Sequence, residues 1–116
     1  MIVVDVVRSK STLRLRLAGN WGGGEENLRS GRAVQSALAE ALVKDAEALT
    51  EVVIDYSDVH GLGGDGPTWS TAPAMRRKLD VRFVASGENH SWLSEFLSAT
   101  NMDRLIRLDG EPRGTA

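Results

Sequence analysis

The alternation of hydrophobic and polar positions near the start of the chain predicts two β-strands. Residues 2–7 form a short β-branched run bounded by polar residues, which is typical of a strand. The segment TLRLRLAG, residues 12–19, places three leucines on one face and Arg14 and Arg16 on the other, which is the period-two pattern of a half-buried strand. The intervening RSKS can supply a hairpin turn, so we expect the two strands to be antiparallel neighbours.

Two longer segments have the spacing of amphipathic helices. Over residues 28–48, hydrophobic residues recur at steps of three and four. Gly31 leaves the start of this helix open, because glycine costs about 1 kcal/mol relative to alanine inside a helix. The segment NHSWLSEFLSATN, residues 89–101, has the same spacing, with Asn89 or Ser91 as candidate N-caps. Asn101 suits the left-handed residue that closes a helix.

The second half of the chain alternates strands with helices. EVVIDY (residues 51–56), DVRFVAS (80–86) and DRLIRL (103–108) are predicted strands, and MRRKL (75–79) ends a helix between the first two. Such alternation implies right-handed crossovers and parallel pairing. The element order β-β-α-β-α-β-α-β predicts a single α/β domain, a small mixed β-sheet with helices mainly on one face. It occupies residues 1–110, and a mobile polar tail follows at 111–116.

Composition narrows the class of protein. The chain has 116 residues, is 41% hydrophobic and 26% charged, and carries a net charge of −2, as expected for one globular domain with no nucleic-acid partner. It has no cysteine, which excludes disulfides, thiolate nucleophiles and cysteine-based zinc sites. No window approaches the roughly 18 apolar residues of a membrane span. The N-terminus has Asp5 within its apolar run and no basic region before it, unlike a signal peptide. We expect a cytoplasmic protein without direct membrane insertion.

The stretch VVIDYSDVHGLGGDGPTW, residues 52–69, carries the candidate chemistry. Four potential metal ligands fall within a short span: Asp55, Asp58, His60 and Asp65. Aspartates at a strand end more often cap turns through their side chains, so no metal site is predicted. A Ser-His-Asp set stays open at this point, although the GxSxG motif is absent.

The segment GLGGDG within this stretch is superficially similar to a phosphate-binding loop. It lacks the GK[ST] ending of a P-loop, and it is expected to come after a bend of several residues, whereas a dinucleotide fingerprint follows its strand directly. An anion site made by backbone N–H groups at a helix start remains an alternative. Without any ligand, Asp65 can act as a helix N-cap and Pro67 suits a first turn. Pro73 then either kinks this helix or delays its start.

The same stretch resembles the signature of STAS domains, the family of sulfate transporter and anti-sigma-factor antagonist modules. In EVVIDYSDVHGLGGDG an apolar strand ends in Asp55, Leu62 matches the family's hydrophobic position, and residues 63–66 fall on its Asp-Ser-Ser-Gly quartet. VRFVASG and WLSEFLSATNMDRLIRL resemble the family's later strand, closing helix and final strand, with Asn101 where glycine is usual. The resemblance covers nearly the whole chain and implies a STAS-like fold.

The chain departs from the family at the position that matters for regulation. In the family that the chain resembles, a partner kinase phosphorylates the first serine of this quartet. The matching residue in this chain is Gly64, which has no hydroxyl. Asp65 matches the second serine, and its single charge mimics a phosphate only in part. The hydroxyls of Thr68, Ser70 and Thr71 are either turn and cap residues or displaced phosphorylation sites.

The resemblance implies a non-enzymatic interaction module that docks a protein partner through residues 61–77. That partner is an anti-sigma factor of serine-kinase type, or a transporter component if the chain is a soluble STAS subunit. The candidate partner-binding residues are Asp55, His60, Gly63, Gly64, Asp65, Gly66, Thr68, Trp69 and Arg76. Trp69 and Trp21 are each either binding anchors or packing residues. No cofactor is expected, and the alternative from another class is a small enzyme or nucleotide- or anion-binding protein using Asp55, His60 and Asp65.

Overall fold

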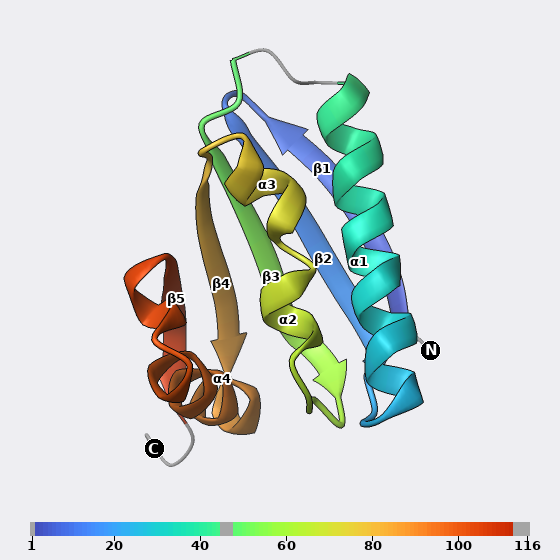
Figure 1. The fold of residues 1–116 in the computed structure, drawn as a ribbon, viewed down its shortest axis with the longest axis vertical. Helices are drawn as coiled ribbons and strands as arrows, with labels where there is room; N and C mark the ends of the chain where they lie inside the picture. The colour runs from blue at the N-terminus through green and yellow to red at the C-terminus, as the bar shows by residue number, and fades with distance from the viewer. Residues whose placement is uncertain (1, 45–47, 113–116) are drawn as a thin grey trace.

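The structure, a computed structural model, describes residues 2–44 and 48–112. Five strands form one sheet in the order β1-β2-β3-β4-β5 (Figure 1). They are β1 (Ile2–Ser9), β2 (Thr12–Asn20), β3 (Glu51–His60), β4 (Asp80–Ser86) and β5 (Ile106–Pro112). β1 and β2 pair antiparallel, and every other pair is parallel. The predicted mixed sheet with an opening hairpin is confirmed.

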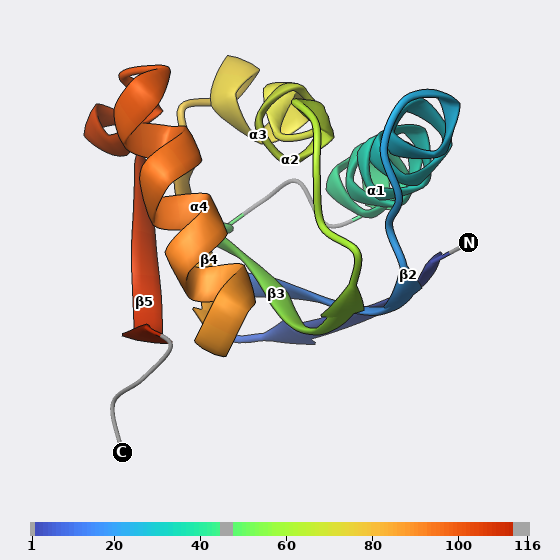
Figure 2. The same cartoon turned by 90° about the horizontal axis from the view of Figure 1, so that it is seen from below.

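The helices cover one face of this sheet. They are α1 (Glu25–Lys44), α2 (Gly66–Trp69), α3 (Ala72–Arg76), α4 (Gly87–Ala99) and the short 3-10 helix η1 (Met102–Arg104). Figure 2 shows α1, α2 and α3 side by side above the sheet. The opposite face is open and charged: Arg14 pairs with Asp55 at 2.8 Å, and Arg82 pairs with Glu51 and Asp109 at 3.2 and 2.9 Å.

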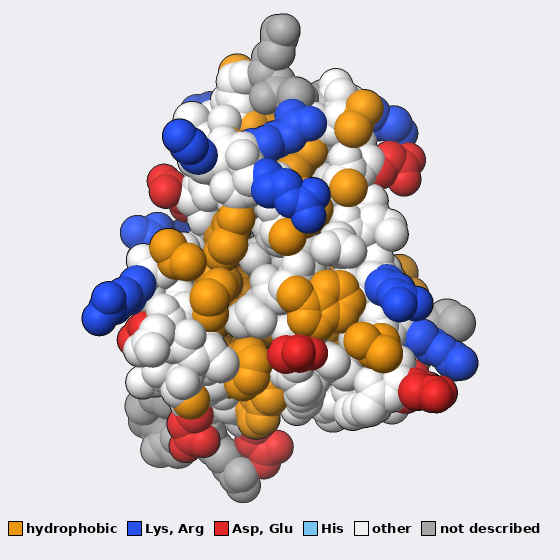
Figure 3. All heavy atoms as spheres, viewed as in Figure 1, with side chains coloured by type: hydrophobic (Ala, Val, Ile, Leu, Met, Phe, Trp, Pro, Cys, Tyr) orange, Lys and Arg blue, Asp and Glu red, His pale blue; other side chains and the backbone are white. Residues whose placement is uncertain are grey.

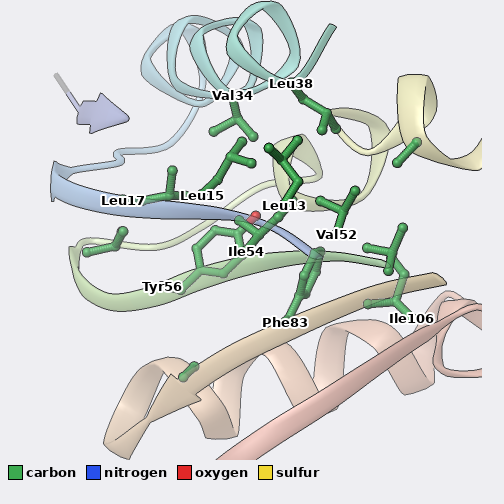
Figure 4. Packing of buried hydrophobic residues seen from close by; sticks show 14 of the residues in the cluster. Leu13, Leu15, Leu17, Val34, Leu38, Val52, Ile54, Tyr56, Phe83 and Ile106 are labelled. Atoms are coloured by element: carbon green, nitrogen blue, oxygen red, sulfur yellow. The ribbon is translucent and has the colours of Figure 1, made fainter. Parts of the chain in front are cut away.

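The core lies between the sheet and the helices and follows the predicted alternation. Leu13, Leu15 and Leu17 of β2 are at most 1% exposed, and their side chains point toward α1 (Figure 4). Tyr56 of β3 stacks edge-on against Phe83 of β4, with ring centroids 5.1 Å apart. Successive side chains of a strand point to opposite faces of the sheet. The leucines at every second position of β2 therefore determine which face α1 covers.

Strand β3 is longer than predicted. Its register against β2 shifts between Arg16, opposite Asp55, and Ala18, opposite Asp58, so that β3 contains one extra residue, a β-bulge. The bulge keeps Val59 in the core at 3% exposure, and pairing continues to His60. The bend expected between this strand and GLGGDG is therefore absent, and the GLGGDG loop follows β3 directly from residue 61.

Helix ends also differ from the sequence-based expectations. Helix α1 begins at Glu25, so Gly31 lies inside it. Helix α4 begins at Gly87 with Ser86 at the N-cap position, which makes both predicted caps, Asn89 and Ser91, wrong. The Asn89 amide instead donates to the carbonyls of Tyr56 and Val59, at 2.9 and 2.7 Å, and holds the end of β3.

The C-terminal segment confirms one expectation and shifts another. Asn101 has φ 59°, the predicted left-handed conformation. Residues 102–104 form η1 and β5 starts at Ile106, so the last strand begins three residues later than expected. Strand β5 runs to Pro112, two residues into the predicted tail, and residues 113–116 lie outside the described part of the chain.

Truncating a core leucine tests this packing. Leu15→Ala removes a side chain that is 0% exposed beneath α1, and we expect it to lower the free energy of unfolding by about 2–5 kcal/mol. Arg16→Ala, on the exposed face of the same strand, is the control and should change it by less than about 0.5 kcal/mol. Urea unfolding followed by circular dichroism measures both. Equal effects would contradict the assignment of the two faces.

Candidate functional site

The segment after β3 forms two short helices instead of one. Pro67 and Pro73 each lie in a first turn, of α2 and α3 respectively, where a missing N–H is tolerated. Ser70 and Thr71 separate the helices, and the Thr71 carbonyl accepts the N–H groups of Ala74 and Met75 at 2.9 and 3.1 Å. Pro73 therefore starts a new helix. The expected helix start near Pro73 is thus confirmed by α3, which begins at Ala72, but the residues before it are not one irregular loop, because α2 occupies 66–69.

The buried side chain of Asn27, in the first turn of α1, holds the loop before α2. Its Oδ1 accepts a hydrogen bond from Trp21 Nε1 and another from the backbone N–H of Gly66, both at 2.9 Å. Its Nδ2 donates to Asp65 Oδ1 at 3.0 Å. One amide therefore ties the end of β2, the start of α1 and the start of α2 together.

Asp65 occupies the predicted N-cap position of α2, but its side chain makes no capping hydrogen bond, so that part of the prediction is wrong. Its Oδ1 instead accepts from Asn27 and from Trp69 Nε1, each at 3.0 Å. These two hydrogen bonds, first that from Asn27 and then that from Trp69, hold the pKa of Asp65 below its usual value. The carboxylate is exposed yet fixed in direction.

Trp69 packs on α1 and not on the sheet. A Cβ atom added at Gly31 would lie 2.5 Å from Cη2 and Cζ2 of the Trp69 ring, so only glycine leaves room for this approach. The Trp69 side chain stays partly exposed, with its Nε1 bonded to Asp65. Trp21, in contrast, is 0% exposed and packs against Tyr56 at 5.8 Å, which makes it a core residue.

A shallow groove of about 460 Å³ runs beside Trp69 along α2 and α3. Its lining residues are mostly hydrophobic: Thr68, Trp69, Thr71, Ala72, Met75, Arg76 and Met102. Figure 3 shows hydrophobic side chains gathered on this face, with an acidic group at the α2 end and Lys or Arg groups over α3. We call this surface, together with Asp65, the α2–α3 surface.

Of the three hydroxyls proposed as displaced phosphorylation sites, two are inaccessible. Ser70 and Thr71 are both 0% exposed, and their hydroxyls donate to the carbonyls of Pro67 and Thr68. Thr68 is partly exposed, and its hydroxyl donates to the Asp65 carbonyl at 2.8 Å. All three therefore act as turn residues in this conformation.

Asp55 and His60 do not join the other predicted residues. Asp55 lies on the open face of the sheet, and its side chain bonds Arg14 and the N–H of Ser57. Burial raises the pKa of Asp55, but the hydrogen bonds from Ser57 and from Arg14 outweigh it and hold that pKa below its usual value. His60 is exposed at the end of β3, on the same open face as Asp58 by register. Within the described residues, no three His, Asp or Glu side chains gather as metal ligands.

Of the predicted residues, Thr68, Trp69 and Arg76 line the groove, and the Asp65 side chain is bonded to Trp69 beside it. Gly63 and Gly64 belong to the loop before α2, Gly66 is buried at its start, and Asp55 and His60 lie apart on β3. The sequence pattern did not indicate the role of Asn27 or the packing role of Gly31. Gly64, at φ 76°, has its missing Cβ position filled by the Asn27 amide, 2.5 Å away. Only the position of Asn27 three residues after the glycine run 22–24 could have signalled this, and nothing local shows that its amide reaches residue 65.

Comparisons with known proteins support the fold. No known family model matches the chain, and no curated protein matches it. Among solved structures it is similar to an uncharacterised protein of the DUF3478 family from Shewanella loihica, described as having a SpoIIAA-like fold. The TM-score is 0.52 at 16% identity, over 94% of this chain and 84% of that one. The chain has a SpoIIAA-like fold. The STAS-like architecture inferred from the sequence is therefore confirmed at the level of the fold.

No helix within residues 2–44 and 48–112 is both long enough and apolar enough to cross a membrane.

Replacing Asn27 tests its role in holding the loop. Asn27→Asp keeps the acceptor for Trp21 and Gly66 but turns the donor toward Asp65 into a second carboxylate. We expect a loss of about 2 kcal/mol in the free energy of unfolding at neutral pH. Adding Asp65→Asn restores a donor facing residue 27 and should recover part of that loss. A double-mutant cycle by urea unfolding measures the coupling, and strictly additive effects would contradict the contact.

The lowered pKa of Asp65 predicts a stability change in acid. A carboxylate whose pKa falls on folding stabilises the native state above its unfolded pKa of about 4 and loses this contribution as the pH drops through the folded value. The difference in unfolding free energy between wild type and Asp65→Asn should therefore shrink as the pH falls below about 4. Thermal melts at several pH values measure it. A difference that stays constant would show that the Asp65 charge does not contribute.

Proposed function

We propose that the protein is a non-enzymatic interaction module that docks a protein partner through the α2–α3 surface. The observation that carries this proposal is a partly exposed tryptophan, Trp69, with its indole N–H bonded to the carboxylate of Asp65, beside a mostly hydrophobic groove. Tryptophan is enriched among residues that dominate binding energy at protein interfaces. A hydrophobic centre with charges at its rim, here Asp65 and Arg76, is the usual layout of such interfaces.

The internal hydrogen bonds support docking because they fix the surface before a partner arrives. Asn27 and Trp69 both hold Asp65, and Gly31 lets the Trp69 ring rest against α1. Side chains that are already ordered lose less conformational entropy on binding. A partner therefore binds to a tryptophan anchor that is already in place and to a carboxylate whose orientation is fixed.

The same contacts disfavour the anion-binding alternative. The backbone N–H of Gly66, which would face an anion at the start of α2, already donates to Asn27 Oδ1. Asp65 places a negative charge beside that N–H, and its low pKa keeps it ionised at neutral pH. An incoming phosphate would meet an occupied donor and a repelling carboxylate.

Regulation at this surface differs from the serine switch that the STAS resemblance implies. Gly64 offers no hydroxyl, and both Ser70 and Thr71 are fully buried. In this proposal Asp65 supplies a permanent single charge at the second serine position. Binding is then controlled by competition or by abundance, with an anti-sigma factor of serine-kinase type as the favoured partner. A transporter component is the alternative outcome of the experiment below.

The test is capture from lysate of the source cells with quantitative mass spectrometry, followed by binding assays with the purified partner. Trp69→Ala should weaken binding by about 30-fold or more, equivalent to about 2 kcal/mol. Asp65→Lys should abolish capture, whereas Asp65→Asn, which keeps an acceptor for Trp69, should retain part of it. Recovery of a kinase-like anti-sigma factor or of a transporter component decides between the two forms.

A charge reversal on the opposite face is the matched control. Asp58→Lys changes an exposed acid of β3 to a base without touching α2 or α3. It should capture the same partner as wild type, and the melting temperatures of all baits should confirm that they are folded. The docking proposal fails if Asp58→Lys and Asp65→Lys lose the partner equally, or if the folded wild-type bait captures nothing that Asp65→Lys does not.

A further inference from the structure

The outer edge of β1 differs from the other edge of the sheet. Among the described residues, β1 pairs only with β2, so its outward row of backbone groups has no strand partner. Val3, Val6 and Val7 are 67%, 39% and 46% exposed along it. The opposite edge strand, β5, contains Gly110 and Pro112, residue types that disfavour further pairing. An eight-residue valine-rich edge without such protection invites another strand.

The sequence of this edge is its own mirror image. Residues 3–7 read VVDVV, a palindrome centred on Asp5. When two copies of a strand pair antiparallel about a two-fold axis at residue 5, residue 3 faces residue 7 and residue 4 faces residue 6. Every valine of the segment then faces a valine. We propose that β1 is the interface of a homodimer, in which two copies join their sheets about an axis through Asp5.

The faces of the two sheets agree in this register. Directly opposite residues in antiparallel strands point to the same side, so Val3 and Val7 of both copies share the open face. Val4 and Val6, which lie on the side of α1 by their register with Leu17 and Leu15, likewise meet each other. A shift by one residue would place open-face positions against helix-face positions, which a two-fold axis perpendicular to the sheet forbids.

Asp5 is the unfavourable element, and it limits the strength of the dimer. The two carboxylates would lie opposite each other on the open face, and like charges directly opposite are destabilising. Arg16 of β2 pairs in register with Asp5 in each copy and brings a positive charge next to each carboxylate. A contact made by one strand per copy is also small, so we expect dissociation in the micromolar range.

The residues at the two ends of β1 are also compatible with this pairing. Arg8 would face Ile2 of the second copy, beside a depression of about 430 Å³ between β1 and α1. This depression is lined by Ile2, Glu26, Arg29, Ser30 and Ala33. It gives the long Arg8 side chain room, and Glu26 offers it a carboxylate, while Arg29 must turn away from it.

Cysteine scanning tests the register, because the protein has no cysteine of its own. Opposite residues in antiparallel strands have Cα atoms about 4.5–5.5 Å apart, within the range that a disulfide spans. Asp5→Cys should oxidise to a disulfide-linked dimer. Val3→Cys and Val7→Cys should each stay mostly monomeric alone but cross-link to each other when mixed. Leu105→Cys, 63% exposed at the far edge of the sheet, is the background control.

Sedimentation at increasing protein concentration tests the dimer without cross-linking. Val7→Lys should weaken association at least about tenfold, and Asp5→Asn should strengthen it about tenfold by removing the like charges. Leu105→Lys should change nothing. Val7 and Asp5 are exposed, so these variants should melt like wild type. A protein that stays monomeric even as Asp5→Asn, a dimer indifferent to Val7→Lys, or cross-linking of Asp5→Cys no faster than of Leu105→Cys would each overturn the proposal.

Discussion

The amide of Asn27 is the contact on which the α2–α3 surface depends. Its oxygen accepts from Trp21 and from the start of α2, and its nitrogen reaches Asp65. The residue is 6% exposed and its partners Trp21 and Gly66 are buried, so their N–H groups would otherwise be left without a partner or solvent. Because Trp21 follows β2 and both Asp65 and Gly66 lie at the start of α2, this one side chain of α1 sets where the loop sits relative to the sheet and α1.

Close packing transmits that position to the surface. Gly31 lets the Trp69 ring approach α1, and Gly64 lets the loop backbone approach the Asn27 amide. The two prolines then start α2 and α3 at fixed points. The outcome is a tryptophan, a carboxylate and a hydrophobic groove held by the body of the domain. This preformed arrangement is suited to docking, whereas its occupied N–H group is poorly suited to binding an anion.

The two faces and the two edges of the sheet have different roles. One face packs against the helices, and the other neutralises its arginines with acids, as Arg82 does between Glu51 and Asp109. Charged pairs of this kind keep an open sheet face soluble without a covering layer. The valine-rich edge at β1 has no such pairs of opposite charges, except where Asp5 lies in register with Arg16. A surface for a partner on the helix side and an edge for a second copy can therefore be used independently.

The sequence by itself determined the architecture, because period-two and helical spacings are local and survive small errors at element ends. The leucine stripe of β2, the order of strands and helices and the left-handed Asn101 all followed from it. Local patterns also located the loop and Trp69. Tertiary structure alone decided what Asp65 does, that Asp55 belongs to the other face, and that β3 continues through a bulge to His60. Each of these depends on a partner distant in sequence, such as Asn27, 38 residues from Asp65, and no spacing in a single chain encodes such a contact.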